Sequence, residues 1–341
     1  PLAPADPATV DALRARQTGL MRTRLTEMLG IEHPIMLAGM GGVAYHKLVA
    51  AVSEAGGMGT LGASTMGDGE LPRQMALVRG ATRKPFGVDL LQAVAGQVDK
   101  GIDYVITGGA SLFVAGLGIP RDALDELHAN GILVASMCGK VRHAVAAVAS
   151  GVDFVIAQGT EAGGHTGTVA TAALVPQVVD AVGDSVPVVA AGGLFDGRGL
   201  AAMLAFGADG VWMGTRFIAT PEANTVDGYQ DALLASAADD TVVTRSYTGK
   251  TCRVLANDYT AHHDRHPEQI EPFPAQLVAA YRAGVNHLGQ PPGTAVDPRR
   301  EFFPAGQAAG GITELTPAGD LVRQMMAEAE RTIDRLMELK Q

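Results

Sequence analysis

The chain has 341 residues, of which 47% are hydrophobic and 18% are charged, so we expect a large buried core and no extensive disorder. The formal net charge of −10, with no cluster of Lys and Arg, argues against a nucleic-acid-binding protein. The two cysteines, Cys138 and Cys252, cannot form a disulfide framework, and no segment has the pattern of a signal peptide or a membrane span, so a cytoplasmic setting is expected.

Short β-rich runs alternate with Ala- and Leu-rich amphipathic segments about every 20–30 residues, which is typical of βα units. The runs are almost continuously apolar, as expected for parallel strands covered by helices. Eight of them favour an α/β fold of the closed (β/α)8 TIM-barrel type; the alternative is an open doubly wound sheet, which usually has fewer strands. The predicted strands are 35–37, 59–61, 86–90, 104–107, 133–136, 154–157, 187–191 and 210–213.

Helices are predicted between these strands, and several of them end on a glycine that suits a C-cap. The predicted helices include 47–54, 121–129, 141–149, 199–205 and a final amphipathic helix over 317–339. The capping glycines are Gly56, Gly131, Gly151 and Gly207.

The βα rhythm stops after Thr220. Residues 221–300 contain DD, HHDRHP and QPPG, lack strand signals, and indicate helical pieces joined by loops. We therefore predict a barrel made of residues 22–220 and 301–341, a smaller, mainly helical cap of residues 221–300 inserted over the substrate face, and an N-terminal extension of residues 1–21. The three histidines of HHDRHP lack the regular spacing of a metal-binding helix, so a solvated loop is favoured over a zinc site and no metal is predicted.

Active sites of parallel barrels form at the carboxyl ends of the strands, so the loops after each strand are the places to search. Five of these loops are rich in glycine: AGMGG at 38–42, GASTMGDG at 62–69, AQGTEAGGHTG at 157–167, GGLFDGRG at 192–199 and GTRF at 214–217. Glycine removes the Cβ atom that would keep a backbone away from a ligand.

The loops after the seventh and eighth strands predict a phosphate site. Gly192, Gly193 and Gly214 offer backbone N–H groups there, and Thr215 adds a hydroxyl. The alternative is that each glycine pair is only a tight turn. No G-x-G-x-x-G follows the first strand, so a mononucleotide such as FMN is favoured over a dinucleotide on a Rossmann sheet.

His165 stands in a loop that is otherwise almost bare of side chains. An imidazole beside a flat cofactor can accept or donate a proton or orient an anionic oxygen. The alternative is a hydrogen-bonded loop histidine with no chemical role. Glu161 is expected to tie the loop to neighbouring backbone, and Asp196 to cap the helix that begins near Gly199.

Several longer motifs together resemble the nitronate monooxygenase (2-nitropropane dioxygenase-like) family over about residues 22–335. The same architecture includes FMN-dependent enoyl-acyl-carrier-protein reductases and NADH:quinone reductases. The motifs are HPIMLAGMGGV, LVAAVSEAGGMGTLGAS, PFGVDL, GTEAGGHTG, PVVAAGGLFDGRGLAAMLAFGADGVWMGTRFIAT and AGQAAGGITEL.

This resemblance implies an FMN-bound barrel with a smaller helical domain, and it implies roles for individual residues. His165 matches the family's catalytic histidine, which acts as a base toward nitroalkanes and mainly orients nitronates or quinones. The residues implied to contact the flavin are Ala38, Gly39, Met40, Gln158, Gly163, Gly164, Gly192, Gly193, Gly214, Thr215 and Gln307.

Two flavin-site positions depart from the family pattern. Asp89 stands where relatives often have the asparagine of PFGVN, so a carboxyl group replaces an amide beside the flavin. Met137 stands where many relatives carry a lysine, and the missing cation would change how an anionic reduced flavin is stabilised.

Three functions compete. The first, which we predict over the other two, is an FMN-dependent nitronate monooxygenase that oxidises alkyl nitronates with dioxygen. The second is an NAD(P)H-dependent FMN reductase of an enoyl thioester or a quinone, although no pyridine-nucleotide site is recognisable. The third is a barrel that binds flavin but acts as a carrier or interaction module. Ala-rich apolar surface segments permit a homodimer, and no nucleic-acid or membrane partner is expected.

Overall fold

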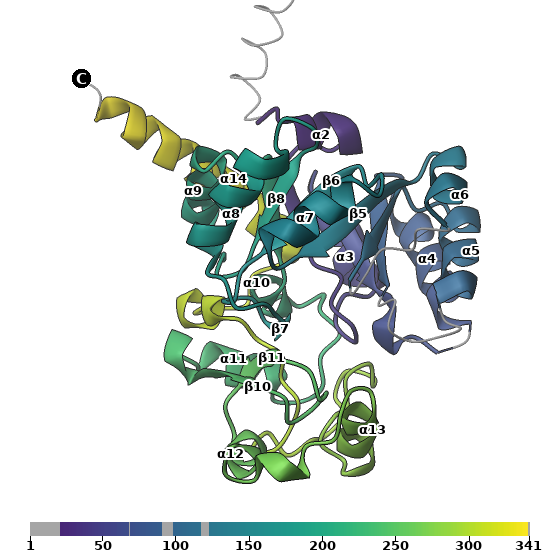
Figure 1. The fold of residues 1–341 in the computed structure, drawn as a ribbon, viewed down its shortest axis with the longest axis vertical. Coiled ribbons are helices and arrows are strands. Elements are labelled where there is room, and N and C mark those ends of the chain that lie inside the picture. The colour runs from purple at the N-terminus through teal and green to yellow at the C-terminus, as the bar shows by residue number, and fades with distance from the viewer. Residues whose placement is uncertain (1–20, 68, 91–97, 117–122, 340–341) are drawn as a thin grey trace, which may run out of the picture.

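The computed structural model describes residues 21–67, 69–90, 98–116 and 123–339. Figure 1 shows a barrel of parallel strands surrounded by helices, with a smaller group of elements below it. Within the described ranges, no helix combines the length and the hydropathy that a bilayer crossing requires. Of the predicted N-terminal extension, only Met21 falls among the described residues.

Eight parallel strands form the barrel, in the order β1-β9-β8-β6-β5-β4-β3-β2. A bridge between Met36 and Met58 joins the two edge strands, so the sheet closes and the predicted TIM barrel is confirmed over an open doubly wound sheet. The strands are β1 (Ile35–Leu37), β2 (Gly59–Gly62), β3 (Phe86–Leu90), β4 (Leu112–Ala115), β5 (Leu133–Cys138), β6 (Phe154–Gln158), β8 (Val188–Ala191) and β9 (Gly210–Met213).

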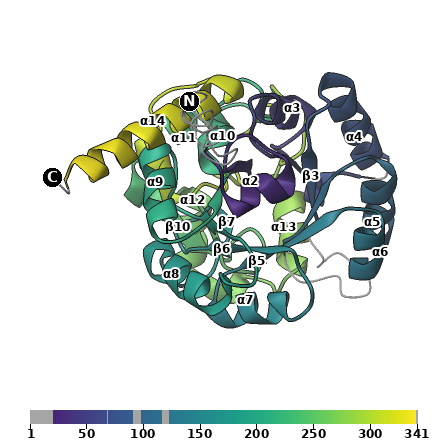
Figure 2. The ribbon, with the colours of Figure 1, turned by 90° about the horizontal axis from the view of Figure 1, so that it is seen from above.

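Helices surround the strands in a ring that is clear from above in Figure 2. The outer helices are α3 (His46–Glu54), α4 (Glu70–Ala81), α5 (Val98–Thr107), α6 (Leu124–Ala129), α7 (Val141–Val148), α8 (Thr171–Val182), α9 (Gly197–Ala205) and α14 (Ala318–Glu338). The four predicted capping glycines all have positive φ, from 71° at Gly131 to 98° at Gly151. Asp196 caps α9 as predicted, because its side chain accepts a hydrogen bond from the N–H of Gly199.

The inside of the barrel is a packed core and not a pore. Leu112, Phe154, Ile156 and Trp212 project inward and fill it. Short helix α2 (Arg24–Leu29) covers the amino-terminal end (Figures 1 and 2). The Arg24 guanidinium pairs there with Asp209 at 2.8 Å. With that end closed, a ligand site can form only at the carboxyl ends of the strands.

The prediction of the fourth strand at residues 104–107 is wrong. These residues form the end of α5, and the strand is β4, which begins at Leu112. Ile102 and Val105 are buried while Asp103 and Thr107 are exposed, so the apolar residues follow a helical spacing. Packing on one face of a helix outweighed the strand propensity of the β-branched residues.

Residues 221–300, called the cap segment below, contain more strand than predicted. Helices α11 (Tyr229–Leu234), α12 (Asp258–Arg265) and α13 (Ala275–Arg282) are present, but β10 (Thr241–Thr244) and β11 (Cys252–Leu255) form an antiparallel pair. A two-residue strand from the barrel side, β7 (Gly164–His165), extends this small sheet. The cap segment therefore lies over the carboxyl ends of the barrel strands (Figure 1).

Candidate active site

A cavity of about 1290 Å³ opens between the strand ends and the cap segment. It brings together His165 and almost all the residues predicted to contact a flavin. Those that line it are Ala38, Gly39, Met40, Asp89, Met137, Gln158, Gly163, Gly164, Gly192, Gly193, Gly214 and Thr215. Gln307 is not among the lining residues: its N–H donates to the Glu161 carbonyl, and the next residue, Ala308, lines the cavity instead.

The loops after β8 and β9 present N–H groups that no other part of the described chain uses. Gly192 and Gly193 have φ of 105° and 73°, and in the described ranges no acceptor lies within hydrogen-bonding reach of the N–H of Gly193, Gly214 or Thr215. The Thr215 hydroxyl oxygen accepts from the N–H of Gly306 at 2.9 Å, so its proton stays available. Unused donors at the edge of a cavity suit an anionic group such as a phosphate.

Glycine is needed in the 157–167 loop for two different structural reasons. A Cβ on Gly159 would lie 2.0 Å from the Thr171 hydroxyl, and one on Gly163 would lie 2.6 Å from the Gly306 nitrogen. Gly159 and Gly163 therefore allow the loop to pack closely against Thr171 and Gly306. Gly164, with φ of 71°, faces open space, because a Cβ added there would have no atom within 4 Å. Gly164 therefore leaves room for a ligand beside the loop.

Glu161 anchors the same loop, as predicted. Its carboxylate accepts hydrogen bonds from the N–H of Thr171 at 2.9 Å and from the Thr171 hydroxyl at 2.8 Å. From the cap side, the Arg253 guanidinium donates to the Thr160 carbonyl at 2.9 Å. The loop that carries His165 is thus fixed by both the barrel and the cap segment.

His165 lies at the junction of barrel and cap, because β7 pairs with β11 at Cys252. Burial, aided by the positive charge of Lys250, lowers the pKa of His165 to about 4. The imidazole is therefore neutral at pH 7 and has an unprotonated nitrogen.

The hydrogen bonds around Thr248 indicate which nitrogen of His165 is unprotonated. The Thr248 hydroxyl donates to the Lys250 carbonyl at 3.1 Å, and its oxygen accepts from the Lys250 N–H at 3.2 Å. Since a hydroxyl has only one proton, a Thr248 hydroxyl that donates to the Lys250 carbonyl can only accept at its 3.2 Å contact with His165 Nε2, and this network favours Nε2 as the donor. Nδ1 of His165 is then the basic atom at the cavity.

Sequence reasoning missed the cap residues that complete the site. Thr248, Lys250, Phe273 and Tyr281 all line the cavity, and the Lys250 ammonium lies 4.4 Å from the centre of the Phe273 ring. Phe273 also meets the His165 ring edge-on, with 6.3 Å between the ring centres. The motifs gave no signal for these residues, because they meet His165 only through the fold of the cap segment.

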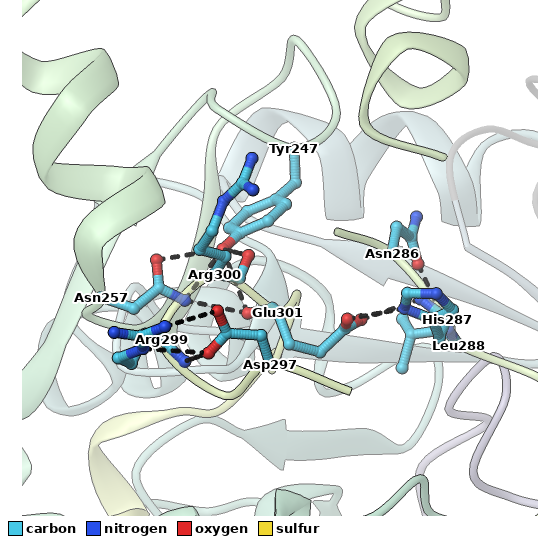
Figure 3. A network of polar contacts seen from close by, with 9 residues as sticks. All are labelled: Tyr247, Asn257, Asn286, His287, Leu288, Asp297, Arg299, Arg300 and Glu301. Atoms are coloured by element: carbon cyan, nitrogen blue, oxygen red, sulfur yellow. Dashed lines mark hydrogen bonds and ion pairs between the residues drawn. The ribbon is translucent and has the colours of Figure 1, made fainter. Parts of the chain in front are cut away.

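A buried polar network holds the cap wall of the cavity (Figure 3). The Glu301 side chain is 1% exposed and accepts from the His287 N–H at 2.8 Å, while its other oxygen lies 2.7 Å from His287 Nδ1. The Tyr247 hydroxyl donates to the Glu301 carbonyl at 3.0 Å. Asn286 and Leu288, on either side of His287, line the cavity, so Glu301 positions that part of the wall.

Glu301→Leu should lower the free energy of unfolding by about 3 kcal/mol. The substitution removes a buried carboxylate and leaves the His287 N–H and the His287 ring without their hydrogen-bond partner. Urea unfolding followed by circular dichroism measures the change. Asp297→Asn is the matched control: Asp297 pairs with Arg299 in the same network but is exposed, so stability should hardly change. Equal losses in the two variants would contradict a specific role for Glu301.

Comparisons with known proteins identify the family of the chain. The profile of the family described as "Nitronate monooxygenase" matches residues 22–105 and 91–328. A (3aS,4S,5R,7aS)-5-hydroxy-7a-methyl-1-oxo-octahydro-1H-indene-4-carboxyl-CoA dehydrogenase from Rhodococcus jostii is 44% identical over 238 residues, which are 70% of this chain and 67% of the relative. A probable nitronate monooxygenase from Staphylococcus aureus is 33% identical over 79% of this chain and 88% of its own. Among solved structures, FabK from Thermotoga maritima superposes with a TM-score of 0.84 at 35% identity, covering 94% of this chain and 99% of that one.

Proposed function

The chain belongs to the nitronate monooxygenase family of flavin-dependent oxidoreductases, and we propose that it is an FMN-dependent enzyme that acts on an acyl thioester. The size and lining of the cavity carry the proposal. At about 1290 Å³ it exceeds the roughly 300–1,000 Å³ of pockets that hold one small molecule, so a cofactor and a long substrate both have room.

The strand-end half of the cavity suits FMN. The unused N–H groups of Gly193, Gly214 and Thr215 would hold its phosphate. Small residues, Ala38 and Gly39, would lie beneath the flat ring and leave it space. When bound, FMN supplies the acceptor or donor of hydride.

The outer half of the cavity suits a thioester with a phosphorylated carrier. Val278 and Tyr281 on α13 line it and are 46% and 63% exposed, which offers an apolar wall to an acyl or pantetheine chain. Lys140, in the loop after β5, and Lys250, on the cap segment, line the cavity too, and neither forms an ion pair with a carboxylate in the described part of the chain. Two unpaired cations in a protein of net charge −10 favour an anionic ligand at this end.

His165 would handle the proton of the reaction. Its neutral imidazole keeps Nδ1 free to accept the proton that the substrate releases as hydride leaves, and the same nitrogen would return it in the reverse direction. Thr248 and β7 hold the ring in place for both directions.

Oxidation of alkyl nitronates with dioxygen is the second candidate, and one observation favours it. The unprotonated Nδ1 of a buried, neutral His165 also suits removal of a carbon-bound proton from a nitroalkane or orientation of its nitronate. The 33% identity to a probable nitronate monooxygenase agrees with that chemistry.

Flavin spectra distinguish the two candidates. We expect enzyme reduced with dithionite and then freed of it to be reoxidised, without oxygen, by crotonyl-CoA or cyclohexenecarbonyl-CoA, and propyl-2-nitronate with dioxygen to turn over slowly. The measurement is stopped-flow absorbance of the flavin. Fast aerobic turnover of the nitronate with no response to either thioester would replace the first candidate by the second. A colourless protein that binds no added FMN would exclude both.

A further inference from the structure

Asp89 ends the inner face of β3 and turns a carboxyl group into the cavity. Phe86, Val88 and Leu90 pack outward against the helices, so alternation along the strand points Gly87 and Asp89 into the barrel. The side chain lies against Gly39: a Cβ placed on Gly39 would be 2.2 Å from the Asp89 Cβ and 2.9 Å from Oδ2. The carboxyl is therefore fixed at the floor where the flavin ring would lie.

No charge in the described structure compensates this carboxyl. The segments beside it, at the ends of β1, β2 and β4, present Met40, Ser64 and Val114, none of which is charged. On α5, which packs behind β3, Lys100 and Asp103 are exposed on the outer surface. The ionisable groups that share the cavity are Glu161, His165, Lys140, His143, Lys250, Tyr229, Tyr281 and Cys252, and none of them forms a hydrogen bond or an ion pair with Asp89 in the described structure.

Burial alone raises the pKa of Asp89 to about 8. The direction follows from the surroundings, because the side chain is only partly exposed at the floor of the cavity, and a partly desolvated carboxylate without a charged partner holds its proton more strongly. Below the raised pKa the side chain is a neutral acid that both donates and accepts a hydrogen bond. A side-chain amide has the same two abilities, so asparagine is the replacement that keeps the hydrogen bond and removes the titration.

We propose that Asp89 carries its proton in the resting enzyme at neutral pH and donates it in a hydrogen bond to the flavin ring, which makes Asp89 a positioning residue; at higher pH, where Asp89 is ionised in the oxidised enzyme, flavin reduction is coupled to proton uptake at this carboxyl. The inference rests on the proposed FMN site. Electrons added to the ring make it more negative, and a nearby negative charge favours the protonated form of a carboxyl. Reduction should therefore hold the proton on Asp89 to higher pH than in the oxidised enzyme.

The proposed coupling predicts how the midpoint potential of bound FMN changes with pH. At a pH above the Asp89 pKa of the oxidised enzyme, each two-electron reduction should take up one additional proton at Asp89. The midpoint potential of bound FMN should then fall by about 30 mV more per pH unit above pH 8 than below it, since a tenfold change in an equilibrium constant is 29.6 mV for two electrons. Asp89→Asn keeps a donor but cannot titrate, so it should lose this additional slope and bind FMN as the unsubstituted enzyme does.

Two measurements on the FMN-loaded enzyme test the inference. Spectroelectrochemical titration between pH 6 and 10 gives the slope, and redox difference infrared spectroscopy near pH 9 should show a carboxylic-acid C=O band on reduction that Asp89→Asn lacks. Asp89→Leu, which offers neither donor nor acceptor, should bind FMN more weakly. Asp103→Asn is the matched control, because Asp103 is an exposed carboxyl on α5 and should leave slope and band unchanged.

The outcomes separate this inference from the proposed function. If the unsubstituted enzyme bound FMN but had the same slope and the same infrared bands as Asp89→Asn, Asp89 would be ionised or remote from the ring and the inference would be overturned while the flavin site stood. If no variant bound FMN, the proposed function itself would fail.

Discussion

His165→Ala should lower turnover by roughly 10²–10⁴-fold while FMN stays bound, the usual scale for losing a positioned acid–base group. The loops after β8 and β9, which are proposed to hold the phosphate, do not include His165, so flavin content should be unchanged. A substrate from which a carbon-bound proton must be removed should lose most, and a preformed nitronate should lose less, because only its orientation depends on the imidazole. Stopped-flow measurement of both half-reactions shows which step is affected.

The pH profile provides a check that a merely structural role would not produce. Because the pKa of His165 is lowered to about 4, its neutral form predominates above that pH, so activity should be flat with respect to His165 from pH 5 to 8 and fall as the pH drops through about 4. Thr248→Val removes the acceptor that fixes Nε2 as the donor and should give an intermediate loss. Unchanged rates in His165→Ala would make His165 an ordinary hydrogen-bonded loop residue.

Gly193→Val should give largely colourless protein. The branched side chain would project beside the N–H groups proposed to hold the phosphate, and a Cβ there already lies 3.3 Å from the Glu161 Cβ. Any L-residue at φ of 73° also costs about 1–2 kcal/mol, so the two effects must be separated. Flavin content per protein, measured from absorbance after denaturation, is the readout.

Gly131→Val is the matched control for this substitution. Gly131 ends α6 with φ of 71° and has no atom within 4 Å of a Cβ position, so it carries the same backbone strain away from the cavity. It should lose stability but keep its flavin. Equal flavin loss in both variants would point to general unfolding, and full occupancy in Gly193→Val would show that the phosphate lies elsewhere.

Much of the barrel could be predicted from the sequence because its signals are local. Continuous apolar runs, followed by glycine-rich loops at regular intervals, indicate parallel strands whose ends meet at one face. From that regularity, His165, Gly193 and Thr215 were expected to lie near one another, and all three line the cavity. The mistake at 104–107 arose where the signal was ambiguous, since YVIT suits either a strand or the buried face of a helix.

The cap side of the site followed from tertiary structure alone. Strands β10 and β11 are four residues long and gain their stability from pairing with each other and with β7. The pairing of β11 with β7 joins Cys252 to His165, which are far apart in the chain, and no local pattern in either segment announces such a contact.

The chemistry of the site divides in the same way. The sequence by itself determined the residue types at the strand ends: an imidazole in a loop with few side chains, glycines in the loops after β8 and β9, and a carboxyl at Asp89. Only the tertiary structure decided their protonation, because the pKa values of His165 and Asp89 are set by water exclusion and by side chains brought from elsewhere in the chain. Composition fixes which groups can titrate, and burial and neighbouring charge fix which form each group takes at pH 7.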